Sequence, residues 1–288
     1  MQLLVNTTRF GLQVFISDNA SFYAGKTGLV MGSAPSVSVA KNLDSNVVKI
    51  GVGDLPFRAE NLGPFDFWVS SNGYYPLAHD EKHLSHIRKY CKKFLLSPQS
   101  LQEVDKKNCI KTLDFISSIL PSSNIIIYDQ THFGGETCFP KNYCCDFWDY
   151  FGNESSLQDL LSAQYQIEDS YKITHTVATH GFALAVLLKL NPIYIAGIEL
   201  PVTVKDYNYY HWWKNPLPLM RLRLLVQRAR KPRLKTDFGG NALTDTLKDF
   251  ENIARIAREA NISVYCLNKN SILTKVDGID YLSVTNNA

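Results

Sequence analysis

The sequence predicts an α/β protein with a doubly wound, mostly parallel sheet and an inserted lid. Two observations lead to this prediction. Short apolar runs alternate along the chain with segments of helical spacing, an order that favours parallel strands joined by right-handed crossovers. Glycine, serine or asparagine follows several of the apolar runs, which marks where each strand turns. Such an arrangement is Rossmann-like, and its ligands bind beyond the carboxyl ends of the strands.

The composition narrows the class of protein. A length of 288 residues suits one domain with an inserted segment, and 45% hydrophobic and 20% charged residues are typical of a folded soluble chain. The net charge of +3 is too small to indicate nucleic acid, and the apolar run at 182–188 is far shorter than the ~20 residues of a membrane span. The N-terminus lacks the pattern of a signal peptide, and the six cysteines show no CxxC spacing. We therefore expect a cytoplasmic protein with reduced thiols and without a metal or other cofactor.

The first half of the chain contains an N-terminal extension and five predicted strands. Residues 1–27 form the extension, with β-like pieces at 3–5 and 12–16 that would make a hairpin or a strap at the domain edge. The first part of a nucleotide-binding domain is then predicted over 28–200. Its early strands are TGLVMG at 27–32 and the runs at 47–52, 65–70, 94–96 and 124–128, and helical spacing occurs within 80–90 and 101–120.

The second half repeats the alternation of helix and strand. Residues 176–190 are an apolar helix that stops at Asn191 and Pro192, followed by the β-branched strand IYIAGI. Residues 201–240 lack periodicity and are rich in Tyr, Trp, Pro and Arg, which predicts a lid insertion. Residues 241–288 complete the domain with an amphipathic helix at 243–260, the strand ISVYCL and a C-terminal tail.

The stretch Gly32 to Ser36, with the sequence GSAPS, is the predicted phosphate-binding turn. Gly32 lets the chain turn sharply off the first strand, and Pro35 presets the backbone for the start of a helix. Ser33 and Ser36 add hydroxyl donors beside Ala34, and the N–H groups of a helix start favour an anion. The alternative is a plain strand-to-helix turn. The turn lacks the GxGxxG spacing, so it gives no reason to expect NAD.

Two further strand ends carry hydrogen-bonding side chains. Asp54 follows the second strand, and Ser71 and Asn72 follow the third. These three side chains are predicted to bond the sugar hydroxyls or the base of a nucleotide. Their alternative role is turn chemistry, in which Asp, Asn and Ser are all favoured.

Three motifs resemble those of a known group of enzymes. GSAPS, THGFALAVLLKLNPIYIAGIEL and ISVYCLNKNSIL are similar to segments of the small bacterial CMP-sialic-acid-dependent sialyltransferases. They also resemble the motility-associated-factor glycosyltransferases and archaeal pterin diphosphokinase-like proteins. The likeness runs in pieces from about residue 28 to 273 and skips the lid. It implies a glycosyltransferase that transfers a nucleotide-activated sugar, with a CMP-linked donor favoured, to a glycan or lipid-linked acceptor in surface polysaccharide biosynthesis.

The resemblance also implies roles for individual residues. Nucleotide binding falls on Gly32 to Ser36, on Asp54, and on Ser71 or Asn72. The Thr-Ser-Gly that opens the family's second-half helix matches Thr179, His180 and Gly181, with His in place of Ser.

The predicted catalytic base follows from a histidine that the resemblance leads us to expect in the lid and that this sequence lacks. The family's catalytic histidine precedes the last long helix, but the matching stretch TDFGGNALTD has none. His211, in DYNYYHWWKN, is therefore the predicted general base, and His180 is the second candidate. Tyr207 and Tyr210 are predicted donors to the leaving phosphate. A packed aromatic loop residue is the alternative for His211.

The basic run at 221–235 allows more than one interpretation, and the acidic residues near strand ends bear on an alternative function. The run contains apolar residues among its charges, so a peripheral contact with the inner face of a membrane is an alternative to a solvated surface. No nucleic-acid motif accompanies it. A pterin diphosphokinase-like transferase would need Mg²⁺ on carboxylates, for which Asp54, Asp66 and Glu199 are the candidates near strand ends. A non-catalytic nucleotide-binding protein is the third function class.

Overall fold

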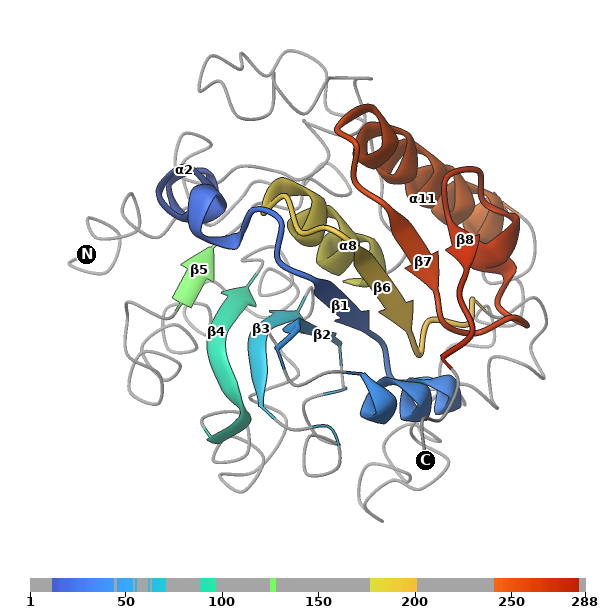
Figure 1. Ribbon diagram of the computed structural model, residues 1–288, viewed down its shortest axis with the longest axis horizontal. Coiled ribbons are helices and arrows are strands. Elements are labelled where there is room, and N and C mark those ends of the chain that lie inside the picture. The colour runs from blue at the N-terminus through green and yellow to red at the C-terminus, as the bar shows by residue number, and fades with distance from the viewer. Residues whose placement is uncertain are drawn as a thin grey trace, which may run out of the picture.

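The computed structural model describes residues 12–43, 46–53, 55, 62, 64–70, 89–96, 125–127, 177–200 and 241–284. Within these residues, eight strands form one sheet in the order β5-β4-β3-β2-β1-β6-β7-β8, and every neighbouring pair is parallel (Figure 1). The predicted α/β class and parallel sheet are confirmed. The strands are β1 (Gly28–Met31), β2 (Val48–Val52), β3 (Phe65–Ser70), β4 (Cys91–Leu96), β5 (Ile125–Ile127), β6 (Ile193–Ala196), β7 (Val264–Cys266) and β8 (Asp280–Tyr281).

The strand order reverses direction at β1. From this central strand the chain builds outward to β5 on one side, and it then returns to add β6, β7 and β8 on the other side. Met31 at the end of β1 pairs with Gly51 of β2 and with Ala196 of β6. The crevice of a doubly wound sheet opens where the order reverses, so it lies beyond the carboxyl ends of β1 and β6.

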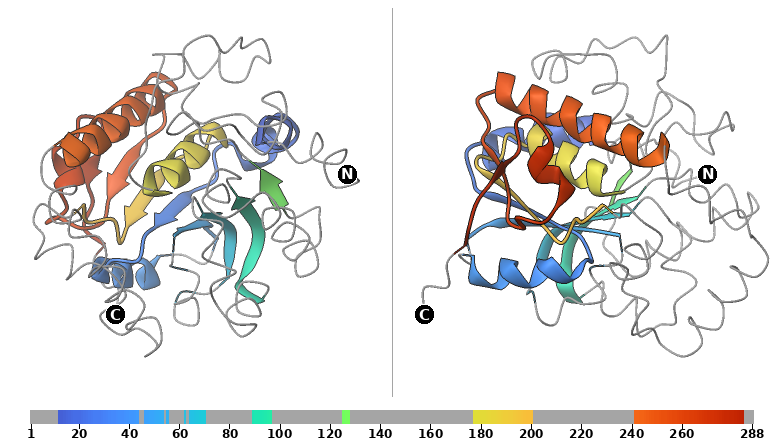
Figure 2. Two further views of the ribbon diagram at one scale, coloured as in Figure 1. Left: turned by 180° about the vertical axis from the view of Figure 1, so that it is seen from behind. Right: turned by 90° about the vertical axis from the view of Figure 1, so that its right-hand side faces the viewer.

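In the described part of the chain, three α-helices cover one face of the sheet: α2 (Leu12–Tyr23), α8 (Val177–Leu187) and α11 (Asn241–Glu259). The 3₁₀ helix η2 (Pro35–Asn42) lies on the opposite face, where Figure 2 shows it in blue beneath the sheet. A short 3₁₀ helix, η9 (Ile272–Lys275), precedes β8. Helices on both faces are what the right-handed crossovers of a doubly wound sheet require.

The helix α8 is buried all round. Every residue from Ala178 to Leu187 is buried, because α8 lies between the sheet and α11. Gly181 makes the close approach possible, since a Cβ there would lie 2.4 Å from Cγ1 of Val52. The Phe182 ring stacks on Phe250 of α11 with 5.8 Å between their centroids. An apolar helix without a polar face is typical of such a buried position.

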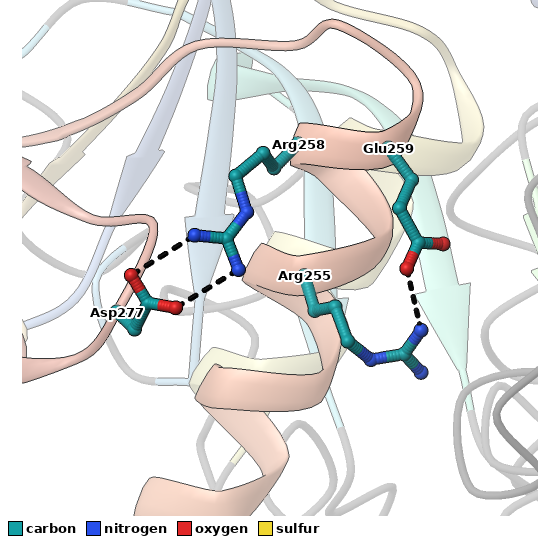
Figure 3. Close-up of polar contacts among 4 residues, drawn as sticks. All are labelled: Arg255, Arg258, Glu259 and Asp277. Atoms are coloured by element: carbon teal, nitrogen blue, oxygen red, sulfur yellow. Dashed lines mark hydrogen bonds and ion pairs between the residues drawn. The ribbon is translucent and has the colours of Figure 1, made fainter.

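The helix α11 is amphipathic, as its sequence predicts. Its inner face carries Phe250, Ile253, Ala254 and Ala257, all fully buried. Its outer face carries the ion pairs of Figure 3, in which Arg258 bonds both carboxylate oxygens of Asp277 and Arg255 bonds Glu259 at 2.8 Å. These pairs are largely exposed, so each adds little stability. The Arg258 pair joins α11 to the turn before β8, whereas the Arg255 pair lies within α11.

The prediction of a β-like piece at 12–16 is wrong, because these residues begin the helix α2. Phe15, Ile16, Ala20 and Tyr23 recur at helical spacing, and Phe15 and Tyr23 both pack on Phe67 of β3, at 5.8 and 5.4 Å between ring centroids. A window of five residues does not reveal a period of 3.6. The short strand β8 and the 3₁₀ character of η2 were not predicted.

Several predicted elements lie outside the described residues. They are the piece at 3–5, residues 80–88 and 101–120 of the predicted helices, and the lid at 201–240. Among the helices that the structure describes, none is both long and apolar enough to span a membrane.

Candidate functional site

The turns after β1 and β6 close on each other at the centre of the sheet edge. The Gly32 N–H donates to Ala196 O at 2.9 Å, and the Ala34 N–H donates to Gly197 O at 3.0 Å. A Cβ on Gly32 would lie 2.3 Å from Gly197 O, and a Cβ on Gly197 would lie 2.4 Å from Gly32 O. Gly197 also has a φ of 66°, a conformation that favours glycine. We call this pair of turns the glycine crossing.

The predicted phosphate turn therefore has a structural role of its own. Ala34 is extended and precedes Pro35, the first residue of η2, as the sequence predicts for a helix start. The Ser36 hydroxyl oxygen accepts a hydrogen bond from the Gly197 N–H at 3.1 Å. Both the Ala34 N–H and the Ser36 oxygen thus hold the crossing together. Ser33, half-buried, lies within the same turn.

The first turn of α8 lies at the same edge of the sheet. Cγ1 of Val177 is 3.3 Å from the Cβ position of Gly53, the glycine that follows β2 with a φ of 59°. Thr179, His180 and Gly181 follow in this turn, and all three are fully or nearly fully buried. The structure thus brings these predicted residues to the edge that carries the glycine crossing.

A buried carboxyl group, that of Glu199, lies beyond β6. From the sequence, Glu199 was considered only as one of three acidic residues that a magnesium-dependent alternative would need. Glu199 is 8% exposed, and its Oε1 accepts a hydrogen bond from Asn268 Nδ2 at 2.7 Å. Its Oε2 is buried and has no hydrogen-bond partner among the residues that the structure describes. Burial raises the pKa of Glu199 to about 7, against the opposing effect of its hydrogen bonds. The only signal in the sequence is an acidic residue next to an apolar strand.

The turn after β7 completes the surroundings of Glu199. The Asn268 carbonyl oxygen Oδ1 accepts from the Asn270 N–H at 3.0 Å, which holds the amide toward Glu199. The Ser271 hydroxyl donates to Ile198 O at 3.0 Å and so ties this turn to the one after β6. Burial also raises the pKa of the Cys266 thiol, and the charge of Glu199 raises it further. The site is thus built from the ends of three adjacent strands.

The carboxylates that the pterin diphosphokinase-like alternative would need for magnesium do not all share one edge of the sheet. Asp66 lies at the amino end of β3, where it accepts from the Lys49 N–H at 2.9 Å and pairs with Lys92 at 2.8 Å. Glu199 lies beyond the carboxyl end of β6. In a parallel sheet these positions are on opposite edges, so the two carboxylates cannot hold one ion. Among the described residues, no cluster of three potential metal ligands occurs.

The remaining predicted site residues lie outside the described residues. They are Asp54, Ser71, Asn72, Tyr207, Tyr210 and His211, together with the basic run at 221–235.

Comparison with solved structures identifies the fold. A variant of the sialyltransferase CST-II in complex with CMP matches with a TM-score of 0.51 and 17% identity, over 91% of this chain and 88% of that chain. The monofunctional alpha-2,3-sialyltransferase Cst-I from Campylobacter jejuni matches with a TM-score of 0.50 and 16% identity, over 92% of this chain and 82% of that chain. No family model matches the sequence, and neither does any curated protein. The expected resemblance is thus confirmed as a shared fold.

We predict that Gly197→Ala destabilises the protein by about 2 kcal/mol or more, because a methyl group would both strain the backbone and collide with Gly32 O. Gly25→Ala is the matched control: Gly25 has a φ of 75°, but nothing lies within 4 Å of its Cβ position. Urea denaturation of the two variants measures the difference. Equal losses would show that the crossing imposes no constraint beyond the backbone angle.

We predict that Glu199→Gln matches the wild type in stability near pH 4.5 and exceeds it above pH 7. The pKa of about 7 lies above the ordinary 4.5, so stability present below pH 4.5 is lost as the pH rises to 7. The amide cannot ionise, and the gain at pH 8 is at most about 3 kcal/mol. Denaturation at pH 4.5, 6 and 8 tests this, with Glu251→Gln on the exposed face of α11 as control. A constant difference between the two variants would contradict the prediction.

Proposed function

We propose that the protein is a glycosyltransferase that uses a nucleotide-activated sugar, with a CMP-linked donor favoured. The observation that carries the proposal is the meeting of the two glycine turns beyond β1 and β6, where the strand order reverses. Doubly wound sheets bind their ligands at this position. The same fold occurs in CST-II, which was solved with CMP. The buried, uncharged residues around the crossing leave a closely packed floor on which a nucleotide could lie.

Nucleotide binding is proposed for the residues at this edge. Gly32 to Ser36 would lie against the phosphate, and the Ser36 hydroxyl could donate to it, since the N–H groups of Gly32 and Ala34 already donate to Ala196 O and Gly197 O. The buried start of α8, at Thr179 to Gly181, would lie behind this turn. Asp54, together with Ser71 or Asn72, would bond the ribose and the base. The short distance between Val177 and Gly53 supports this grouping, because it brings α8 to the turn that leads into position 54.

Catalysis is proposed for His211. It would accept the proton of the acceptor hydroxyl, while Tyr207 and Tyr210 donate hydrogen bonds to the leaving phosphate. The complete burial of His180 favours His211 over it, because a general base has to reach the acceptor.

The acceptor is proposed to be a surface glycan or a lipid-linked precursor in polysaccharide biosynthesis. A cytoplasmic enzyme would meet a lipid-linked acceptor at the inner face of the membrane, and the basic run at 221–235 would contact that face. The separation of Asp66 from Glu199 speaks against the pterin diphosphokinase-like alternative.

We expect CMP to stabilise the protein more than UDP, GDP or ATP does. Ligand at 100 times its dissociation constant adds about 2.7 kcal/mol to the free energy of unfolding. Thermal unfolding with each nucleotide measures this. If none of the four nucleotides raises the unfolding temperature, the protein is not a transferase of this kind. If UDP or GDP raises it more than CMP does, the donor is linked to that nucleotide instead.

We expect His211→Ala to lower turnover about 10²- to 10⁴-fold with the best donor, since that is the usual contribution of a general base. Steady-state kinetics at saturating substrate measures the loss, and His180→Ala is the comparison. Unfolding temperatures are recorded for both variants, because His180 is fully buried and its replacement alters packing. A loss below tenfold at position 211 beside a larger loss at 180, in folded proteins, would assign the base to His180.

A further inference from the structure

Glu199 has a buried oxygen that the fold itself does not use. Among the described residues, Oε1 is held by Asn268 while Oε2 has no hydrogen-bond partner. An unsatisfied buried polar atom destabilises the folded state, and native proteins contain few of them. Glu199 follows β6 at the edge where the strand order reverses, two positions beyond Gly197 of the glycine crossing. A ligand that supplies the missing partner would explain why the side chain is there.

We propose that Glu199 acts as an uncharged carboxyl group that donates a hydrogen bond from Oε2 to a phosphate oxygen bound at the glycine crossing. This inference rests on the proposed function, because the phosphate would be that of the nucleotide. It assigns Glu199 a binding role that is separate from that of the catalytic base.

The hydrogen bond from Asn268 decides which oxygen carries the proton. The amide Nδ2 can only donate, so Oε1 acts as the acceptor and the proton of the neutral carboxyl is on Oε2. The amide is held in this orientation because its own oxygen accepts from the Asn270 N–H. Oε2 is therefore a donor whose position is fixed, which is what an anionic oxygen requires.

The surroundings of Glu199 favour the neutral form. Asn268 and Ser271 from the turn after β7 are uncharged, and no salt bridge to Glu199 occurs among the described residues. Cys266 of β7 is a titratable neighbour of Glu199, and burial raises the pKa of its thiol, so it is also uncharged near neutrality. Burial raises the pKa of Glu199 to about 7. A phosphate next to it would raise this pKa further, since two negative charges repel each other.

Phosphate binding should therefore be coupled to protonation of Glu199. Above the pKa of the unliganded carboxyl, a proton has to be taken up before the phosphate binds. The affinity of the wild type is then expected to fall toward tenfold for each pH unit. Glu199→Gln keeps an acceptor for Asn268 and a donor in place of Oε2, and its amide does not titrate.

The test is isothermal titration calorimetry between pH 7.5 and 9 with CMP and, separately, with inorganic phosphate. In this range CMP is already dianionic, because the second pKa of a phosphate monoester is about 6. Inorganic phosphate loses its second proton at a higher pH than CMP, so its affinities are compared between the three proteins at each pH. The proteins are wild type, Glu199→Gln and Glu251→Gln. Wild type and the Glu251 control should lose affinity about tenfold per pH unit, whereas Glu199→Gln should bind with nearly constant affinity.

A further variant covers the case in which Glu199→Gln does not fold. Asn268→Ala removes a hydrogen bond that lowers the pKa of Glu199, so between pH 7.5 and 9 the affinity of this variant should fall by a smaller factor than that of the wild type. An equal fall in the two proteins would overturn the proposal.

The outcomes separate this proposal from the proposed function. Equal pH dependence of CMP binding in wild type and Glu199→Gln would overturn the role of Glu199 and leave a nucleotide-binding protein. A Glu199-dependent effect with phosphate, without binding of CMP, UDP, GDP or ATP, would support the role of Glu199 and overturn the nucleotide donor. Absence of binding by every probe would overturn both.

Discussion

The contact between Gly32 and Gly197 is the constraint on which the arrangement of this edge depends. Each glycine occupies the space that a side chain on the other would need, and each turn satisfies a backbone group of the other through Ala34 and Ser36. The ends of β1 and β6 are thereby fixed relative to each other at the point where the strand order reverses. A ligand site there starts from a rigid floor, which lowers the entropy lost on binding.

The helix α8 is the second element that lies at this edge of the sheet, and packing determines its position. A helix that is apolar on every side must be covered on every side, and the sheet and α11 provide this cover. Gly181 lets the helix approach Val52, and this brings Thr179 and His180 to the carboxyl edge of β2. The proposed nucleotide-binding positions in the first turn of α8 are therefore held by packing that also forms the core.

At Glu199, the burial that the fold imposes opposes ionisation of the carboxyl group. Burying a carboxyl without a charged partner costs free energy at neutral pH, and a tightly packed core would normally exclude it. The turn after β7 supplies one hydrogen bond and leaves one oxygen without a partner among the described residues. Such a local cost is expected where a residue serves a ligand.

The sequence by itself determined the alternation of strands and helices, the parallel sheet, the bounds of β3 to the residue and the turn at Gly32, since these follow from local periodicity and glycine spacing. It misread 12–16, where five residues are too few to reveal a helical period. The tertiary structure alone decided why Gly32 is a glycine, that Asp66 and Glu199 lie at opposite edges, and that Glu199 meets Asn268. These features join residues far apart in the chain, such as Ser36 and Gly197 at a separation of 161 positions. No local pattern encodes them, because strand order within the sheet determines which turns become neighbours.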